Sequence, residues 1–237
     1  MEVKKLYDQE VTRVFDILDN YLNKYPHQDT ALACKREGEW RKYSVQEYVR
    51  TTNYISYGLM ALGIKKGDKI GIVSSNRPEW NMIDMAVMQI GAISTPLYPT
   101  ISKEDYTHIL NHAEMTMIFI EGRELREKLT PILQEVKTLK HIYTFIKQEE
   151  NIPCFDELVE LGKKNPQLDI LTEIKASIDK YEMATLTILL AQQVCKKALC
   201  SRTIISYKIF INYAISLLNG VIRHYLFSHC AMLMNEC

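Results

Sequence analysis

Two histidines, His108 and His112, stand four residues apart in a segment whose pattern predicts a helix. Both imidazoles would therefore lie on one helical face, as two ligands of a metal ion do. A site of this type needs a third protein ligand, and a hydrolytic one also needs a general-base carboxylate at motif spacing. No such residue accompanies the pair. We interpret the two histidines as part of a solvated helix surface.

A second group with chemical potential is residues 76–79 (Asn-Arg-Pro-Glu), which follow a short apolar run. Ligands of α/β proteins bind where such buried strands end. The simpler interpretation is a turn that starts a helix, with Pro78 in the first turn and the side chains of Arg77 and Glu79 in solvent. The charged residues 121–128 are likewise interpreted as the solvated face of a helix.

Other catalytic patterns are missing from the sequence as written. It contains no glycine-rich phosphate loop, no serine nucleophile elbow and no cysteine–histidine pair with supporting context. Its six cysteines show no metal-ligand spacing, and they indicate a reduced, cytoplasmic setting rather than a disulfide scaffold: Cys34, Cys154, Cys195, Cys200, Cys230 and Cys237. We therefore predict no catalytic, cofactor-binding or metal-binding residue in this chain.

The elements that would position these side chains alternate between helices and strands. Helices are predicted at residues 11–25, 44–62, 78–90, 102–112, 124–136 and 155–161, and strands at 70–73, 92–97, 115–120 and 141–146, with a hairpin around residues 37–39. Ser44 and Glu47 form a capping box at the start of the second helix. Strands alternating with helices at this spacing predict an α/β fold with a mostly parallel sheet and flanking helices.

Composition divides the chain in two. The whole sequence has 237 residues, 47% hydrophobic and 24% charged, with a net charge of zero, which is typical of a globular protein and argues against a nucleic-acid partner. Residues 1–186 carry 24 Lys and Arg against 28 Asp and Glu, whereas residues 187–237 carry five basic residues and one acid. That second segment also holds four of the six cysteines and no proline. No secretory signal is visible at the N-terminus.

Residues from about 40 to 145 resemble the N-terminal part of the adenylate-forming superfamily, and are most similar to bacterial long-chain fatty acid–CoA ligases. The resemblance is carried by Leu-Gly-Ile-Lys-Lys-Gly-Asp-Lys-Ile at 62–70, Ser-Asn-Arg-Pro-Glu-Trp at 75–80, Ile-Gly-Ala at 90–92 and Pro-Leu-Tyr-Pro-Thr at 96–100. It implies an incomplete N-terminal part of the adenylate-forming fold. It also implies an enzyme that activates a fatty acid with ATP to an acyl-adenylate and then transfers the acyl group to CoA.

In that family, a segment like residues 182–186 (Glu-Met-Ala-Thr-Leu) leads into a phosphate loop of the form IYTSGTTG-x-PKG. Here it leads into TILLAQQVCKKALCSR at 187–202. One allowed set of codons for these residues, read from the third base onward, gives YTSGTTGVQKGVMLSH. The first two bases of most codons are fixed by the residues, so a family loop would rarely arise by chance. One lost T at an Ile-Tyr junction accounts for the change of register.

We therefore predict a partial AMP-binding domain at residues 1–186 and a frameshifted, non-native tail at 187–237. The phosphate loop is out of register, so we expect this chain to be inactive and to hold no cofactor, although the resemblance implies ATP, Mg and CoA for the intact family. An incomplete sheet with an exposed edge is also expected.

Two alternatives remain open. The chain could be a non-catalytic α/β interaction module with a membrane-associated tail, because residues 204–222 are apolar; Lys208 and Asn212 interrupt this stretch, which is too short to span a bilayer. It could also derive from another adenylate-forming enzyme, such as an aryl or amino acid activator.

Overall fold

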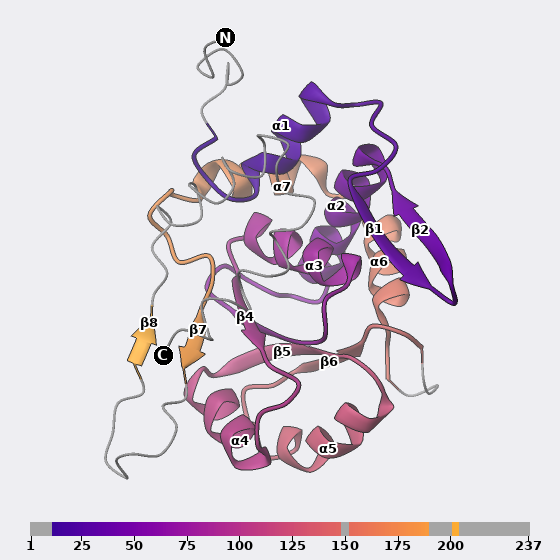
Figure 1. The fold of residues 1–237 in the computed structure, drawn as a ribbon. Helices are drawn as coiled ribbons and strands as arrows, with labels where there is room; N and C mark the ends of the chain where they lie inside the picture. The colour runs from indigo at the N-terminus through magenta and orange to yellow at the C-terminus, as the bar shows by residue number, and fades with distance from the viewer. Residues whose placement is uncertain (1–10, 148–151, 190–200, 204–237) are drawn as a thin grey trace.

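The computed structural model describes residues 11–147, 152–189 and 201–203. Its main body is a three-layer α/β structure with helices on both faces of a sheet (Figure 1). Most of residues 187–237 lie outside the described residues, so the interpretation of this segment as a non-native tail stays a prediction. Two short pieces of it, β7 (Thr187–Leu189) and β8 (Ser201–Thr203), pair antiparallel.

The central sheet has four parallel strands in the order β4-β3-β5-β6. The strands are β3 (Lys69–Val73), β4 (Ile93–Leu97), β5 (Met115–Ile120) and β6 (His141–Thr144). Every residue of β5 is buried, as expected for a parallel strand covered on both faces. The predicted α/β class, parallel sheet and flanking helices are confirmed.

Helices cover the two faces of this sheet in separate groups. One apolar core joins the sheet to α1 (Asp16–Lys24), α2 (Val45–Ala61), α3 (Pro78–Gln89) and α6 (Phe155–Lys164). A second core joins the opposite face to α4 (Lys103–His112) and α5 (Arg123–Leu133). In Figure 1, α4 and α5 lie below the sheet, and α2, α3 and α6 lie above it.

Local sequence signals account for most helix starts. Ser44 Oγ accepts a hydrogen bond of 3.1 Å from the Glu47 amide, and Ser102 Oγ accepts one of 3.1 Å from the Asp105 amide. Both serines satisfy amides that the first helical turn leaves without partners. Pro78 occupies the first turn of α3, where its missing N–H costs nothing.

Two features differ from the sequence-based expectations. The helix α7 (Leu168–Ser177) was not predicted. An exposed sheet edge was expected without a named strand; the β4 edge is paired with the segment that follows α7, where the Ser94 amide donates to the Ala184 carbonyl at 3.0 Å and the Leu186 amide donates to the Ser94 carbonyl at 2.9 Å. This segment runs parallel to β4 and leads into β7.

Helices α2 and α6 approach so closely that glycine is required at their contact. A Cβ atom on Gly162 would lie 1.8 Å from the Tyr54 carbonyl oxygen, and one on Gly58 would lie 2.6 Å from the Leu158 carbonyl oxygen. Real Cβ atoms do not approach backbone oxygens to these distances. The two helices can therefore cross only with a bare backbone at both positions.

The substitution Gly162→Ala should lower the free energy of unfolding by about 3 kcal/mol or more, because the methyl group forces the helices apart. The higher helix propensity of alanine, worth about 1 kcal/mol, does not offset this strain. Urea denaturation followed by circular dichroism measures the change. Lys164→Ala, at an exposed position of the same helix, is the matched control and should stay within about 0.5 kcal/mol. Equal stability of the Gly162→Ala and control variants would contradict the close crossing.

Candidate functional site

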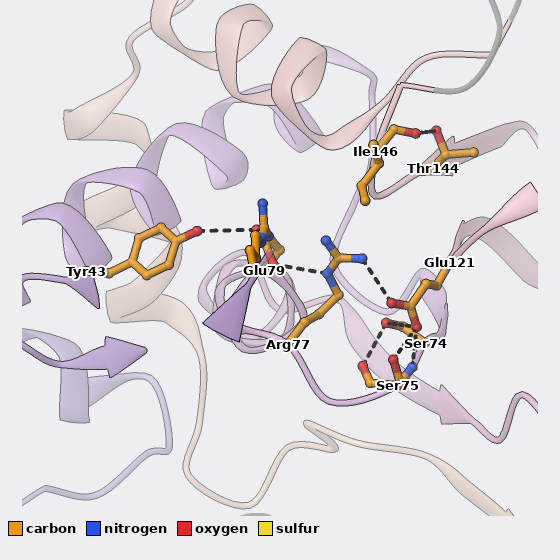
Figure 2. A network of polar contacts seen from close by, with 9 residues as sticks. Tyr43, Ser74, Ser75, Arg77, Glu79, Glu121, Thr144 and Ile146 are labelled. Atoms are coloured by element: carbon orange, nitrogen blue, oxygen red, sulfur yellow. Dashed lines mark hydrogen bonds and ion pairs between the residues drawn. The ribbon is translucent and has the colours of Figure 1, made fainter. Parts of the chain in front are cut away.

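The strand order reverses direction at β3. The chain moves from β3 to β4 on one side, and then crosses over to β5 on the other side of β3. The carboxyl ends of β3 and β5 therefore flank a topological switch point, the place where open α/β sheets bind ligands. Ser74, Ser75 and Arg77 follow β3, and Glu121 follows β5, so the fold brings these polar side chains together (Figure 2).

Arg77 is the centre of this group. Its Nε lies 3.0 Å from Glu79 Oε2, and its Nη1 lies 3.1 Å from Glu121 Oε1. Its guanidinium also stacks over the Phe145 ring, with Cζ 4.6 Å from the ring centroid. The exposed fraction of the Arg77 side chain is only 9%, and that of Glu79 is 7%. The expectation that both side chains are solvated is wrong, because both are buried as an ion pair.

Glu121, which follows β5, binds the loop after β3 at the switch point. Its Oε2 accepts hydrogen bonds from the Ser75 amide at 2.6 Å and from the Ser74 hydroxyl at 3.1 Å, and the Ser75 hydroxyl also donates to it. Partial burial raises the pKa of Glu121, but these donors and Arg77 together outweigh burial and hold the pKa below its ordinary value. Glu121 therefore acts as an ionised anchor for the β3 loop.

Glu79 extends the network toward the β-hairpin formed by β1 (Leu32–Arg36) and β2 (Glu39–Tyr43). Arg36 donates to Glu79 Oε1, and the Tyr43 hydroxyl donates to the same oxygen at 3.3 Å. Burial raises the pKa of Glu79, but its own backbone amide and the two arginines lower it further than burial raises it. Burial, followed by the Glu79 charge, raises the pKa of Tyr43 to about 12.

The charges of this network neutralise one another. The buried guanidinium faces two carboxylates, and both carboxylates have a lowered pKa, which makes them weak general bases at neutral pH. A nucleotide phosphate needs backbone amides and a cation that is not already occupied by carboxylates. The described residues at this end of the sheet therefore do not fit ATP and Mg. What the network can do is fix the loop after β3 against β5 and against the hairpin.

The other residues considered for chemistry lie elsewhere. His108 and His112 lie on α4, exposed, with parallel rings whose centroids are 5.6 Å apart. Within the part of the chain that the structure describes, no three His, Cys, Asp or Glu residues are grouped in a way that could hold a metal ion. In the predicted solvated segment 121–128, Arg126 is in fact buried, with an exposed fraction of 8%. No helix among the described residues is long and apolar enough to cross a bilayer.

A second buried carboxyl group, Asp84, lies on α3 beneath β4. Burial raises its pKa to about 6, and its proximity to Ser94 offsets only part of that rise. Burial, followed by the Asp84 charge, also raises the pKa of Tyr48. Sequence reasoning did not single out Asp84. Its place on the buried face of a predicted helix would have been the one available signal.

The comparisons with known proteins converge on one family. The family described as AMP-binding enzyme matches residues 18–187. Fatty acyl-CoA synthetase A of Dictyostelium discoideum is 30% identical over 144 residues, covering 57% of this chain and 22% of that protein. Long-chain-fatty-acid–CoA ligase FadD15 of Mycobacterium bovis is 28% identical over 148 residues, covering 62% of this chain and 22% of that protein. The chain thus spans about a fifth of the length of these curated relatives.

Solved structures share the fold at lower identity. A red-emitting luciferase from Phrixothrix hirtus has a TM-score of 0.65 at 13% identity, covering 85% of this chain and 38% of that chain. A long-chain-fatty-acid–CoA ligase from Archaeoglobus fulgidus has a TM-score of 0.59 at 18% identity, covering 76% and 35%.

Removing the central cation should destabilise the protein and change its response to acid. Arg77→Ala leaves Glu79 and Glu121 without their shared partner, at an expected cost of about 3 kcal/mol at pH 7. In the unsubstituted protein both carboxyl groups have a pKa lowered from 4.5, so their contribution is present above that pH and is lost as the pH falls through the lower folded-state values. In Arg77→Ala this acid-linked loss should shrink.

Urea denaturation at pH 7, 5 and 4 measures both effects. Arg123→Ala removes an exposed arginine that pairs with Glu127 on α5, and it should change stability by less than about 0.5 kcal/mol. If Arg77→Ala and Arg123→Ala lower the free energy of unfolding by the same small amount, the network does not hold the switch point together.

The raised pKa of Asp84 predicts that its effect on stability changes with pH in the opposite direction to that of Glu79 and Glu121. Its folded-state pKa of about 6 lies above the ordinary 3.8, so the folded protein binds an extra proton between these values and gains stability as the pH falls from about 7 to 5. Asp84→Asn should remove this gain and stabilise the protein at pH 7 by about 2 kcal/mol. Thermal unfolding at pH 7 and pH 5 tests it, with the exposed Asp169→Asn as the control. A destabilised Asp84→Asn at pH 7 would show that the charge has a partner that compensates its burial.

Proposed function

The chain belongs to the AMP-binding enzyme family, whose match covers residues 18–187, and from that membership we propose that it is the N-terminal part of an ATP-dependent fatty acid–CoA ligase whose phosphate loop has been lost by a frameshift. The observation that carries the proposal is the family loop, YTSGTTGVQKG, which one allowed set of codons for residues 187–198 gives when it is read in the neighbouring register.

The family and the fold follow from the comparisons with known proteins. The curated relatives named above are fatty acyl-CoA synthetases and ligases, and the structural neighbours share the adenylate-forming fold. The resemblance of residues from about 40 to 145 to this family is confirmed. ATP, Mg and CoA follow from family membership for an intact enzyme. Fatty acids as the substrates of the intact gene product are proposed from the names of the relatives.

The geometry of the sheet supports the position of the missing loop. Residues 184–186 run parallel to β4 and continue into β7, so the described chain there runs toward the carboxyl edge of the sheet. Parallel α/β sheets bind phosphates at that edge, where glycines allow backbone amides to surround the anion. A glycine-rich loop read from residue 187 onward would therefore stand where a nucleotide binds. The family match also ends at residue 187, where the codon argument places the change of register.

In the register as written, this position carries a different chemistry. Residues 187–202 contain no glycine, and their two lysines stand next to each other at 196–197. Since glycine is needed where backbone amides approach phosphate closely, these residues cannot reproduce the cradle. We propose that the chain is inactive as a ligase for this reason. Cys34 and Cys154 are free thiols, which fits the proposed reducing, cytoplasmic setting.

The test compares two changes in the coding DNA. The purified 237-residue chain should release no AMP from ATP with a long-chain fatty acid and CoA. Inserting one T after the first base of codon 187, in a gene carrying the downstream sequence, should restore the Ile-Tyr junction, the loop and fatty acid-dependent AMP release. Inserting three bases at the same junction leaves the present register unchanged, and it should restore nothing. Turnover by the 237-residue chain would refute inactivity, and a locus without a glycine-rich loop in the neighbouring register would refute the frameshift.

A further inference from the structure

The β1–β2 hairpin has two faces of different character. Its inner face is tied to the body of the protein: Tyr43 is buried, Cys34 packs against the main core, and Arg36 donates to Glu79. The outer face carries four exposed residues, Ala33, Lys35, Trp40 and Lys42. In Figure 1 the hairpin projects from the body beside α2 and α6. The buried ion-pair network therefore holds a rigid ribbon whose other face is free.

The register of the hairpin places a tryptophan between two lysines. Lys35 is directly opposite Trp40 across the strands, and Lys42 stands two residues along the same strand, opposite Ala33. Residues two apart on a strand share a face, so both ammonium groups flank the indole. The exposed fraction of Trp40 is 66%. Among the large hydrophobic residues that the structure describes, only Tyr181 has a higher exposed fraction. No acidic residue shares this face, since Glu39 pairs across the strands with Arg36 and Glu37 lies in the turn.

The hairpin is also basic within an acidic domain. Residues 32–43 contain four basic and two acidic side chains, whereas the rest of residues 1–186 contains 20 basic and 26 acidic ones. An anionic surface would therefore attract the hairpin and repel the rest of residues 1–186. The protein would then approach such a surface with the hairpin toward it. Tryptophan prefers the headgroup level of a membrane, because its ring is apolar and its N–H remains hydrogen-bonded. Lysines beside it pair with anionic headgroups.

We propose that the outer face of the β1–β2 hairpin docks this protein on an anionic lipid surface, with the Trp40 indole at headgroup level and Lys35 and Lys42 against lipid phosphates. The occupant is a membrane surface rather than a second copy of the chain, because two copies of this face would bring four lysines together. A membrane would also hold the fatty acid substrate, and this part of the inference rests on the proposed function. The docking itself does not, because the test below contains neither ATP nor CoA.

The experiment measures binding of the full 237-residue chain to vesicles. Sedimentation with phosphatidylcholine vesicles, with and without phosphatidylserine, should show binding only to the anionic vesicles, weakened by high salt. Lys35→Gln combined with Lys42→Gln should weaken binding about 25-fold, from about fivefold per lysine. Trp40→Ala should weaken it roughly tenfold. The matched controls are Lys137→Gln with Lys140→Gln, an exposed pair in the α5–β6 loop, and Tyr181→Ala, an exposed aromatic elsewhere.

A spectroscopic readout reports on the hairpin directly. Trp80→Phe leaves Trp40 as the only tryptophan in the chain. Its emission should shift to shorter wavelength on anionic vesicles and should be quenched by brominated lipid. Circular dichroism confirms that each variant is folded. The proposal is overturned by absence of binding in a folded chain, by equal binding to neutral vesicles, or by binding that survives the hairpin variants, which would assign it to another segment. Self-association through Trp40 in place of vesicle binding would also overturn it.

Discussion

One buried cation, Arg77, links parts of this fold that lie far apart in the sequence. Its two carboxylate partners come from the first turn of α3 and from the loop after β5, and its aromatic partner follows β6. Through Glu79 the same network reaches Arg36 and Tyr43 of the hairpin. A buried guanidinium is tolerated only when its donors are paired, so this geometry demands that β3, β5 and the hairpin occupy fixed relative positions. The switch point of the sheet is thereby held together by electrostatics rather than by apolar packing alone.

Local signals predicted most of the elements, because they act within a few residues. The strand at residues 115–120 was predicted with its observed bounds, and Ser44, Pro78 and Ser102 begin helices as capping chemistry requires. The burial of Arg77 and Glu79 could not be predicted in this way. The Arg77 partner Glu121 is 44 residues away, and their meeting depends on the crossover from β4 to β5, which no short-range pattern encodes.

The helix α7 was missed for a related reason. Its N-cap position, Gln167, makes no side-chain capping bond, and Leu168 and Ile170 are exposed, so the apolar period is poor. Hydrogen bonds to the carbonyl oxygens at its C-terminal end come from a distant residue, since Arg13 donates to the carbonyl oxygens of Lys175 and Ile178. Lys175 also pairs with Asp19 on α1 at 2.6 Å. A helix stabilised by a partner 162 residues earlier in the chain carries little of its own signal.

The determinants of folding and of chemistry are separated along this chain. The apolar strands, the helix caps, the glycines of the α2–α6 crossing and the Arg77 network all precede residue 187. The pairing of residues 184–186 with β4 completes the described edge of the sheet and directs the chain toward the edge where nucleotides bind. Beyond that point the proposed chemistry depends on residue types that allow backbone amides to face phosphate, and a change of register replaces every one of them at once. The proposed loss of a single base at this junction would therefore leave the fold of the preceding residues intact while removing the ligand site, because the packing residues precede the proposed break and the proposed phosphate-binding residues follow it.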